Sequence, residues 1–283
     1  MSGALLTVAG LERHFDGLRA VDGISFTVAP HEVVSIIGPN GSGKTTTLNL
    51  VTGTIPAHGG SITLDGARID RTDTARIAEH GIARTFQNGR VFATLSVADN
   101  IEVGIHSTLR AHRPFRGLAH YPGLRWIPLL GELFVAIVGT PGARRERARI
   151  DAAVATEIDR FGARLGPRRD EPAYSLSYAN RRRTEIARAL ALQPKLLVLD
   201  EPTAGMNQSE TGEVLEQLLE LKAEGQAILL VEHKLDLVMT VSDRVIVMDG
   251  GRIVAQGPPD EVRRDPAVIE AYLGRRREAE ELA

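Results

Sequence analysis

The chain has 283 residues, no cysteine, and a formal net charge of −2 at pH 7. The absence of cysteine excludes disulfides, thiolate metal sites and cysteine nucleophiles. The near-neutral charge gives no electrostatic attraction to nucleic acid, and the length allows one large domain with its own core.

Residues 5–37 predict strands. No basic segment followed by a long apolar one opens the chain, so we expect no signal peptide. Ile24–Val28 alternates apolar and polar residues with period two, which is typical of a half-buried antiparallel strand. A polar turn that carries one aromatic residue, Phe15, lies before it, and the apolar run Val33–Ile37 after it predicts a buried strand.

A glycine-rich loop follows this buried strand. It consists of Gly38, Pro39, Asn40, Gly41, Ser42, Gly43, Lys44 and Thr45, and the next residue, Thr46, opens a predicted helix. Glycines let the backbone turn its N–H groups inward, and the helix adds its positive end. Lys44 can reach the β- and γ-phosphates, while the Thr45 hydroxyl can ligate Mg²⁺. The alternative is a glycine turn that binds no ligand. The flanking strand and helix favour a phosphate-binding loop for a nucleoside triphosphate, and we expect Thr46 to contact the nucleotide as well.

Short strands and turns are predicted next. Gly59-Gly60 predicts a turn, and Ser61–Gly66 predicts a strand that ends in a turn. The segment Ile82–Gln87 predicts a strand that returns toward the core.

Residues 96–192 are predicted to be mostly helical. Arg110–Gly123, rich in Arg, Pro, Gly and His, predicts a loop, and a charged helix is expected to start near Arg144. The apolar segment Leu124–Val138 contains the single tryptophan, Trp126, and is shorter than the roughly 20 residues of a membrane helix. We favour a helix packed within a lobe over a docking surface for a membrane partner.

A basic helix is predicted after Leu176, with Ser177 as its N-cap. Arg181–Arg183 lie early in this helix, where they oppose its dipole unless an anion or an acidic partner is close. Such a run of charge usually forms a solvated face.

Alternating strands and helices are predicted from Lys195 onward. The apolar runs Leu196–Leu199 and Ala227–Val231 are typical of parallel strands buried on both faces. Arg244–Ala255 predicts a hairpin with a glycine turn, residues 259–273 predict a closing helix or helix pair, and a charged tail follows from Arg275.

Polar residues that can carry chemistry follow the buried strands. Asp200 and Glu201 close the first run, and His233 comes after the second. Since ligands of parallel sheets gather at the carboxyl ends of the strands, Asp200 can bind Mg²⁺ and Glu201 can polarise an attacking water. His233 can donate to the γ-phosphate and hold Glu201 in place. The alternatives are a surface Asp-Glu pair and an ordinary histidine at a strand end. Gln87 also follows a strand, and its amide can ligate Mg²⁺ and sense the γ-phosphate.

Together these motifs, in this order, resemble the ATP-binding cassette of ABC transporters over nearly the whole chain. The resemblance implies an α/β fold, with a P-loop (RecA-like) ABC ATPase core, an antiparallel β lobe and a helical lobe, in a single domain of residues 1–283. It places the β lobe at about 1–30 and 60–80, the core at about 31–58, 81–100 and 190–255, the helical lobe with an insert at about 101–189, and a helical tail at 256–283.

The same resemblance implies roles for individual residues. Gly38–Thr45 match the Walker A motif, and Gln87 matches the Q-loop glutamine. Leu196–Asp200 match the Walker B motif, and Glu201 matches its catalytic carboxylate. Ala204–Asn207 match the D-loop, and His233 matches the switch histidine. Phe15 falls where the family stacks an aromatic ring on adenine, although packing within the β lobe is an alternative.

Finer features are similar to the larger cassette of branched-chain amino acid importers. They are Arg84–Gln87, the long insert after Asn100, Val231–Met239 and Asp265–Gly274. This implies an ATP- and Mg²⁺-dependent ATPase at the cytoplasmic face of the membrane. Its implied partners are a second cassette, identical or different, two membrane permease subunits and, indirectly, an external solute-binding protein, with no nucleic acid. A urea or short-amide importer, a soluble ABC ATPase uncoupled from transport, and a non-hydrolysing regulatory subunit stay open as alternatives.

One motif departs from the family. The family's signature usually reads Leu-Ser-Gly-Gly-Gln, with Tyr allowed at the third place in this subclass, and it contacts the γ-phosphate bound by the opposite cassette. This chain has Ser177 and Tyr178 after the leucine, but Ala179 at the fourth place and Asn180 at the fifth. Ala179 adds a methyl group and Asn180 shortens a side chain. We therefore expect a weaker contribution to the partner's site, which allows an asymmetric dimer with one slow site.

Overall fold

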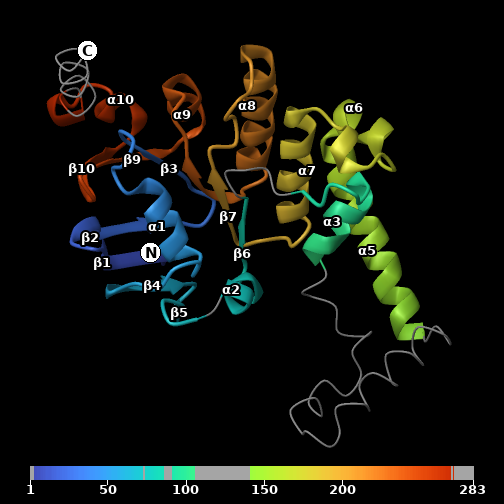
Figure 1. The fold of residues 1–283 in the computed structure, drawn as a ribbon, viewed down its shortest axis with the longest axis horizontal. Helices are drawn as coiled ribbons and strands as arrows, with labels where there is room; N and C mark the ends of the chain where they lie inside the picture. The colour runs from blue at the N-terminus through green and yellow to red at the C-terminus, as the bar shows by residue number, and fades with distance from the viewer. Residues whose placement is uncertain (1–2, 73, 86–90, 106–140, 269, 271–283) are drawn as a thin grey trace, which may run out of the picture. The chain divides into compact units, whose positions relative to one another are not determined.

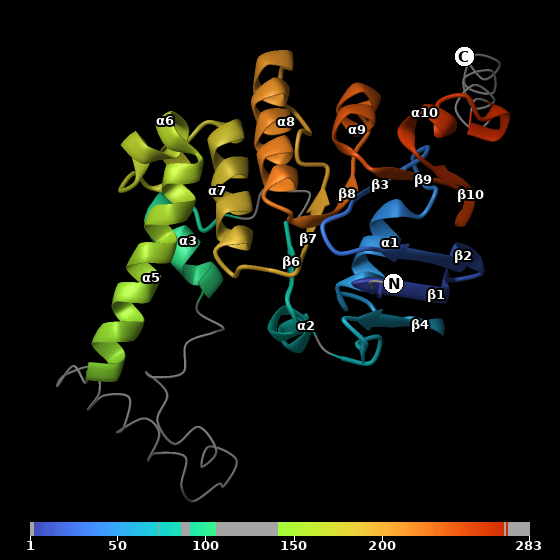
Figure 2. The same ribbon diagram turned by 180° about the vertical axis from the view of Figure 1, so that it is seen from behind.

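The computed structural model describes residues 3–72, 74–85, 91–105, 141–268 and 270 (Figures 1 and 2). The chain divides into two compact units: residues 1–89 together with 194–283, and residues 90–193. Within the described part of the chain, no helix combines the length and apolar character that crossing a membrane requires.

The first unit contains a four-stranded antiparallel sheet. Its strands, in spatial order, are β2 (Leu18–Val28), β1 (Leu6–Phe15), β4 (Gly59–Leu64) and β5 (Ala67–Arg68). Ile24, Phe26 and Val28 are buried while Ser25 and Thr27 are exposed, so the predicted period-two strand is confirmed within the longer β2.

The glycine pair at residues 59–60 corrects one prediction. Gly59-Gly60 was expected to form a turn, but it starts β4 and pairs with β1 across a register shift between Ala9 and Glu12. Gly60 has φ +85°, and a Cβ there would lie 2.3 Å from the carbonyl oxygen of Gly10. The glycine therefore allows two backbones to approach closely at an irregular point of the ladder.

A six-stranded sheet forms the centre of the same unit. Its strands, in spatial order, are β10 (Arg252–Gly257), β9 (Arg244–Asp249), β3 (Val33–Ile37), β8 (Ala227–Val231), β7 (Leu196–Asp200) and β6 (Ile82–Arg84). β10 pairs antiparallel with β9, which confirms the hairpin, and the other neighbours are parallel. Every residue of β3, β7 and β8 is buried, as their apolar runs predicted.

The strand predicted over Ile82–Gln87 is shorter than expected. β6 ends at Arg84, and the Thr85 backbone N–H still donates to the carbonyl of Val198 at 3.0 Å. Residues 86–90 lie outside the described part of the chain, and Gln87 lies among them.

Helices cover both faces of the six-stranded sheet (Figure 1). The helices of this unit are α1 (Lys44–Val51), α2 (Thr74–His80), α8 (Gln208–Ala223), α9 (Leu235–Val241) and α10 (Pro259–Val262). One buried apolar cluster joins α1, through Leu48 and Val51, to residues of both sheets, and a second joins Ile37 to α9 and α10. The predicted closing helix is split, because α10 ends at Val262 and Pro266–Val268 are helical again.

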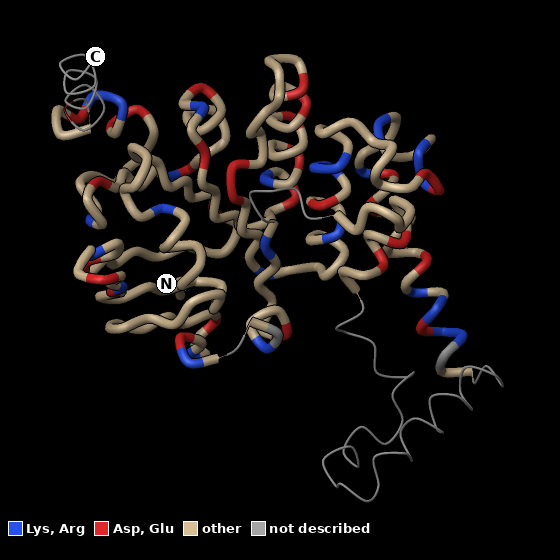
Figure 3. Tube along the Cα trace, in the orientation of Figure 1, with Lys and Arg blue, Asp and Glu red and all other residues tan. Residues whose placement is uncertain are grey.

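The second unit is helical over its described residues. Its elements are α3 (Val97–Ile105), α5 (Pro141–Arg160), α6 (Gly162–Leu165), the 3₁₀ turns Gly166–Arg168 and Ala173–Ser175, and α7 (Tyr178–Leu190). Helices α5 and α7 both pack on α3. The charged helix expected near Arg144 is the first half of α5, where four arginines accompany the single acidic residue Glu146 (Figure 3).

The arginines of α7 do not form the solvated face that such a run usually indicates. Arg182 and Arg183 are 1% and 2% exposed. A guanidinium N–H of Arg182 donates to the Glu185 carboxylate at 2.6 Å, and one of Arg183 donates to the Asn180 side chain at 2.8 Å. A carboxylate on the same helix therefore compensates the charge of Arg182, and an amide oxygen accepts a hydrogen bond from Arg183.

Some predictions fall outside the described residues. These are the loop Arg110–Gly123, the apolar segment Leu124–Val138 with Trp126, and the tail from Arg275. The boundaries of the β lobe, core, helical lobe and tail stay predictions.

Candidate active site

The glycine-rich loop follows β3 and leads directly into α1. Gly38, Gly41 and Gly43 have φ values of +148°, +81° and +101°, in the region that favours glycine. A Cβ on Gly38 would lie 2.1 Å from the carbonyl oxygen of Met248, and one on Gly43 would lie 2.3 Å from that of Ala20. Two of the three glycines are therefore required both by their backbone angles and by neighbouring main chain.

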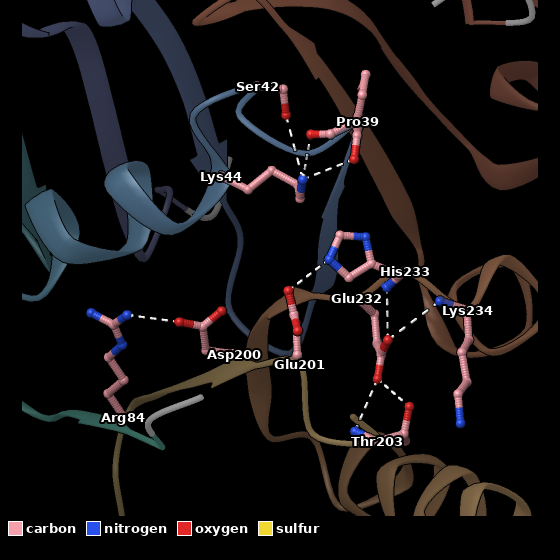
Figure 4. Close-up of polar contacts among 11 residues, drawn as sticks. Pro39, Ser42, Lys44, Arg84, Asp200, Glu201, Thr203, Glu232, His233 and Lys234 are labelled. Atoms are coloured by element: carbon pink, nitrogen blue, oxygen red, sulfur yellow. Dashed lines mark hydrogen bonds and ion pairs between the residues drawn. The ribbon is translucent and has the colours of Figure 1, made fainter. Parts of the chain in front are cut away.

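Lys44 closes over this loop. Its ammonium group donates to the carbonyl oxygens of Gly38 and Pro39, each at 2.8 Å (Figure 4). Lys44 is buried, so its ammonium group is held close to the backbone of the loop. α1 starts at Lys44, and its N-cap Gly43 offers no side-chain hydrogen bond. The first-turn N–H groups, which include those of Thr45 and Thr46, therefore have no side-chain cap, and with the helix dipole they favour an anion.

Parallel pairing brings three further predicted residues to the same sheet edge. β7 ends at Asp200, β8 ends two residues before His233, and β8 lies between β3 and β7. The Glu201 carboxylate and the Nε2 atom of His233 are 2.6 Å apart (Figure 4). Glu201 has φ +48°, unusual for a residue with a long side chain, and its N–H donates to the carbonyl of Val231 at 2.8 Å. A strained backbone thus holds a carboxylate–imidazole pair beside the loop.

Arg84, which had no assigned role of its own, bridges the site. Its guanidinium donates to the Asp200 carboxylate at 2.9 Å, to the Asn49 side chain at 2.7 Å and to the Thr52 hydroxyl at 2.9 Å. The Arg84 and Asp200 side chains are 7% and 1% exposed, so the pair is buried. This contact ties β7 and β6 to α1, the helix that carries Lys44.

A second unpredicted residue is Glu232, which directly precedes His233. Its carboxylate is buried and accepts hydrogen bonds from Thr203, His233 and Lys234. The only sequence signal was a carboxylate at the end of an apolar strand, the same signal that identified Asp200 and Glu201.

Phe15 lies at the end of β1 and is 41% exposed. The Arg13 guanidinium sits over its ring, 4.7 Å from the centroid, as a cation–π contact. An exposed ring is compatible with base stacking, whose assignment to Phe15 stays a prediction.

The four signature residues lie in the second unit, at the start of α7. Ser177 is the N-cap, as predicted, because its hydroxyl accepts a hydrogen bond from the Asn180 N–H at 3.3 Å. Tyr178 is 46% exposed, whereas Ala179 and Asn180 are 2% and 7% exposed. The two positions that depart from the family's pattern therefore face inward in this structure.

Comparison with known proteins shows which family has this sequence and fold. A model of the ABC transporter family matches residues 21–204, and one described as a branched-chain amino acid ATP-binding cassette transporter matches residues 252–278. The chain is 39% identical over 275 residues to the high-affinity branched-chain amino acid transport ATP-binding protein LivG of Salmonella typhimurium, covering 97% of this chain and 99% of that protein. BraF of Pseudomonas aeruginosa, described in the same terms, is 37% identical with the same coverage.

Solved structures agree with the sequence comparison. A nucleotide-free ATP-binding cassette from an ABC transporter matches with a TM-score of 0.76 and 30% identity, covering 95% of this chain and 99% of that chain. The ADP conformation of an ATP-binding cassette gives the same TM-score and identity, covering 96% and 99%. The predicted α/β cassette fold is thereby confirmed, and the chain belongs to the ABC transporter family as one of its ATP-binding cassettes.

Proposed function

We propose that this chain is the ATP-hydrolysing subunit of an importer for branched-chain amino acids. The observation that carries the proposal is the identity of 37–39% over almost the full length of relatives with that role in their names. The match of residues 252–278 to the branched-chain amino acid cassette model supports the same assignment.

In the proposed binding mode, the glycine loop holds the phosphates and Phe15 stacks on the base. Lys44 would exchange its bonds to the neutral loop carbonyls for bonds to the oxygens of anionic phosphate groups, which make stronger, charge-assisted hydrogen bonds. The hydroxyl of Thr45 and the carboxylate of Asp200 are hard oxygen donors of the kind that Mg²⁺ prefers, and we assign the ion to them together with Gln87. When bound, Mg²⁺ would neutralise charge that develops on the phosphates.

Hydrolysis is assigned to the carboxylate–imidazole pair. Glu201 would polarise the attacking water as a general base, and His233 would hold Glu201 and donate to the γ-phosphate. The separation of 2.6 Å between Glu201 and His233 supports this division of roles, because one hydrogen bond can keep both groups in register. Gln87 is assigned to sensing the γ-phosphate.

The proposed assembly contains a second cassette, two membrane permease subunits and an external solute-binding protein. We assign the chain to the cytoplasmic face of the membrane, held there by the permeases. Ser177, Tyr178, Ala179 and Asn180 would contact the ATP bound by the other cassette. Because Ala179 and Asn180 face inward, the Ser177 hydroxyl and the start of α7 would carry that contact.

Uptake by intact cells tests the proposal. Deleting the gene for this chain from its source organism is expected to abolish high-affinity uptake of radiolabelled leucine, isoleucine and valine. The parent gene should restore it, and a Lys44→Ala gene expressed at the same level should not. Uptake of labelled urea and acetamide serves as the internal control. Loss of urea or amide uptake alone would move the assignment to that class, and unchanged uptake of every solute would contradict a role in import.

A further inference from the structure

The carboxylate of Glu232 lies behind the catalytic pair rather than in it. It is 2% exposed and accepts hydrogen bonds through both oxygens. Oε1 accepts from the Thr203 backbone N–H at 3.0 Å and from the Thr203 hydroxyl. Oε2 accepts from the backbone N–H of His233 at 2.7 Å and from the backbone N–H of Lys234 at 3.3 Å (Figure 4).

All four of these partners are hydrogen-bond donors. An ionised carboxylate only accepts, so its two oxygens match the four donors without conflict. A glutamine of the same size would turn an NH₂ group toward at least one pair of donors. The site is therefore specific for a carboxylate and not only for a polar group of this volume.

The two loops that Glu232 joins carry the catalytic pair. Thr203 lies two residues after Glu201, and His233 directly follows Glu232. Two other contacts join the same two segments. The Glu201 backbone N–H donates to the Val231 carbonyl at 2.8 Å, and the Glu201 carboxylate lies 2.6 Å from the His233 ring. Because Glu201 holds an unusual positive φ of +48°, the loop after β7 needs such external contacts to keep its shape.

Lys234 extends the connection to the next segment. Its ammonium group donates to the Met206 carbonyl at 3.1 Å and to the Thr211 hydroxyl in the first turn of α8. The residues on both sides of His233 are thus anchored to Thr203–Thr211, whereas the imidazole side chain is 42% exposed.

We propose that Glu232 is a positioning residue for ATP hydrolysis, whose buried carboxylate fixes the loop after β7 to the loop after β8. It keeps Glu201 and His233 at hydrogen-bond distance and makes them move as one unit. The inference rests on the roles proposed above for Glu201 and His233. It predicts that losing the Glu232 contacts slows turnover more than it weakens ATP binding, since its partners Thr203, His233 and Lys234 include neither Lys44 nor any other residue of the glycine-rich loop.

The experiment compares Glu232→Gln with a pair of threonine variants. Thr203→Val removes one donor to Oε1 at almost constant volume, and Thr203→Ser keeps it. Each tagged full-length chain is purified from its source cells together with the subunits bound to it. The kcat and KM for ATP, the Kd for ATP and the thermal unfolding midpoint are measured for each.

We expect kcat to fall about 10- to 100-fold for Glu232→Gln and about 10-fold for Thr203→Val, with the Kd for ATP within about threefold of the parent. Thr203→Ser should recover kcat to within about twofold. A purely structural role would lower the unfolding midpoint of Glu232→Gln while leaving kcat unchanged. That result, or a Thr203→Ser variant no faster than Thr203→Val, would overturn the proposal. The threonine pair decides the question if Glu232→Gln does not fold.

Two controls separate this inference from the function on which it rests. Glu32→Gln alters another carboxylate, which binds Arg244 at 2.8 Å and the Ala29 N–H at 2.6 Å at the amino end of β3. It should lower the unfolding midpoint and leave kcat within about twofold. Glu201→Gln is measured in parallel. If it hydrolyses ATP like the parent, the proposed site is wrong; if only Glu232→Gln behaves like the parent, the inference alone fails.

Discussion

Polar residues cluster both at the edge of the six-stranded sheet that carries the glycine-rich loop, Glu201 and His233, and at the start of α7. The two regions differ in what these polar residues bind. At the sheet edge, Lys44 donates hydrogen bonds to backbone carbonyls, and Glu201 has a positive φ. At the start of α7, Ser177 makes an ordinary N-cap and Arg183 bonds to Asn180 on the same helix. The first region keeps groups in positions that a ligand can use, whereas most polar groups of the second stabilise the helix itself.

This difference bears on the unusual signature. From the sequence, Ala179 and Asn180 suggested a weaker contact to a partner's ATP, on the assumption that both face the phosphate. In the structure they are 2% and 7% exposed, and the Asn180 side chain is engaged by Arg183. The weaker site in an asymmetric dimer stays a prediction, and the residue with which to test it is Ser177.

Replacing Lys44 by alanine should have the largest effect. It removes charge-assisted bonds to two phosphates, so we expect the Kd for ATP to rise about 10²- to 10⁴-fold. Titration calorimetry measures this directly. Lys44→Arg is the matched control, because it keeps the charge but does not fit the close bonds to Gly38 and Pro39, and it should bind with intermediate affinity. Tight ATP binding by Lys44→Ala would remove the basis for the site.

Replacing Glu201 by glutamine should separate binding from hydrolysis. The amide cannot act as a base, so kcat is expected to fall about 10²- to 10⁴-fold while the Kd for ATP changes little. Trapped ATP should favour association with a second cassette, which size-exclusion chromatography with ATP can detect. A Glu201→Gln chain that turns over at the parent rate would show that another group is the base.

Replacing Ser177 by alanine should have the smallest of the three effects. Losing the N-cap hydrogen bond is expected to lower the free energy of unfolding by about 1 kcal/mol. Chemical denaturation measures this, and Ser177→Asn, which keeps a capping oxygen, should retain most of the stability. The Kd of the monomeric chain for ATP should not change. If it does, the start of α7 contributes to the chain's own nucleotide site and the contrast between the two regions fails.

Several parts of the fold and site were predictable because their signals are local. The glycine loop, the runs that became β3, β7 and β8, and the Ser177 cap each depend on a few consecutive residues. The Gly59-Gly60 turn was predicted wrongly, because a glycine pair has the same local signature in a turn and at a close contact between strands. The buried arginines of α7 were missed for a similar reason, since an arginine's exposure depends on what packs against its helix.

The sequence by itself determined that a phosphate loop exists and that carboxylates and a histidine follow buried strands. It did so because glycine, lysine and apolar runs restrict the backbone over short distances. Only the tertiary structure decided that Arg84 meets Asp200 across 116 positions of the chain, and that Glu232 binds Thr203. These contacts depend on the order and register of parallel strands, which are set by packing of the whole sheet and leave no signature in neighbouring residues.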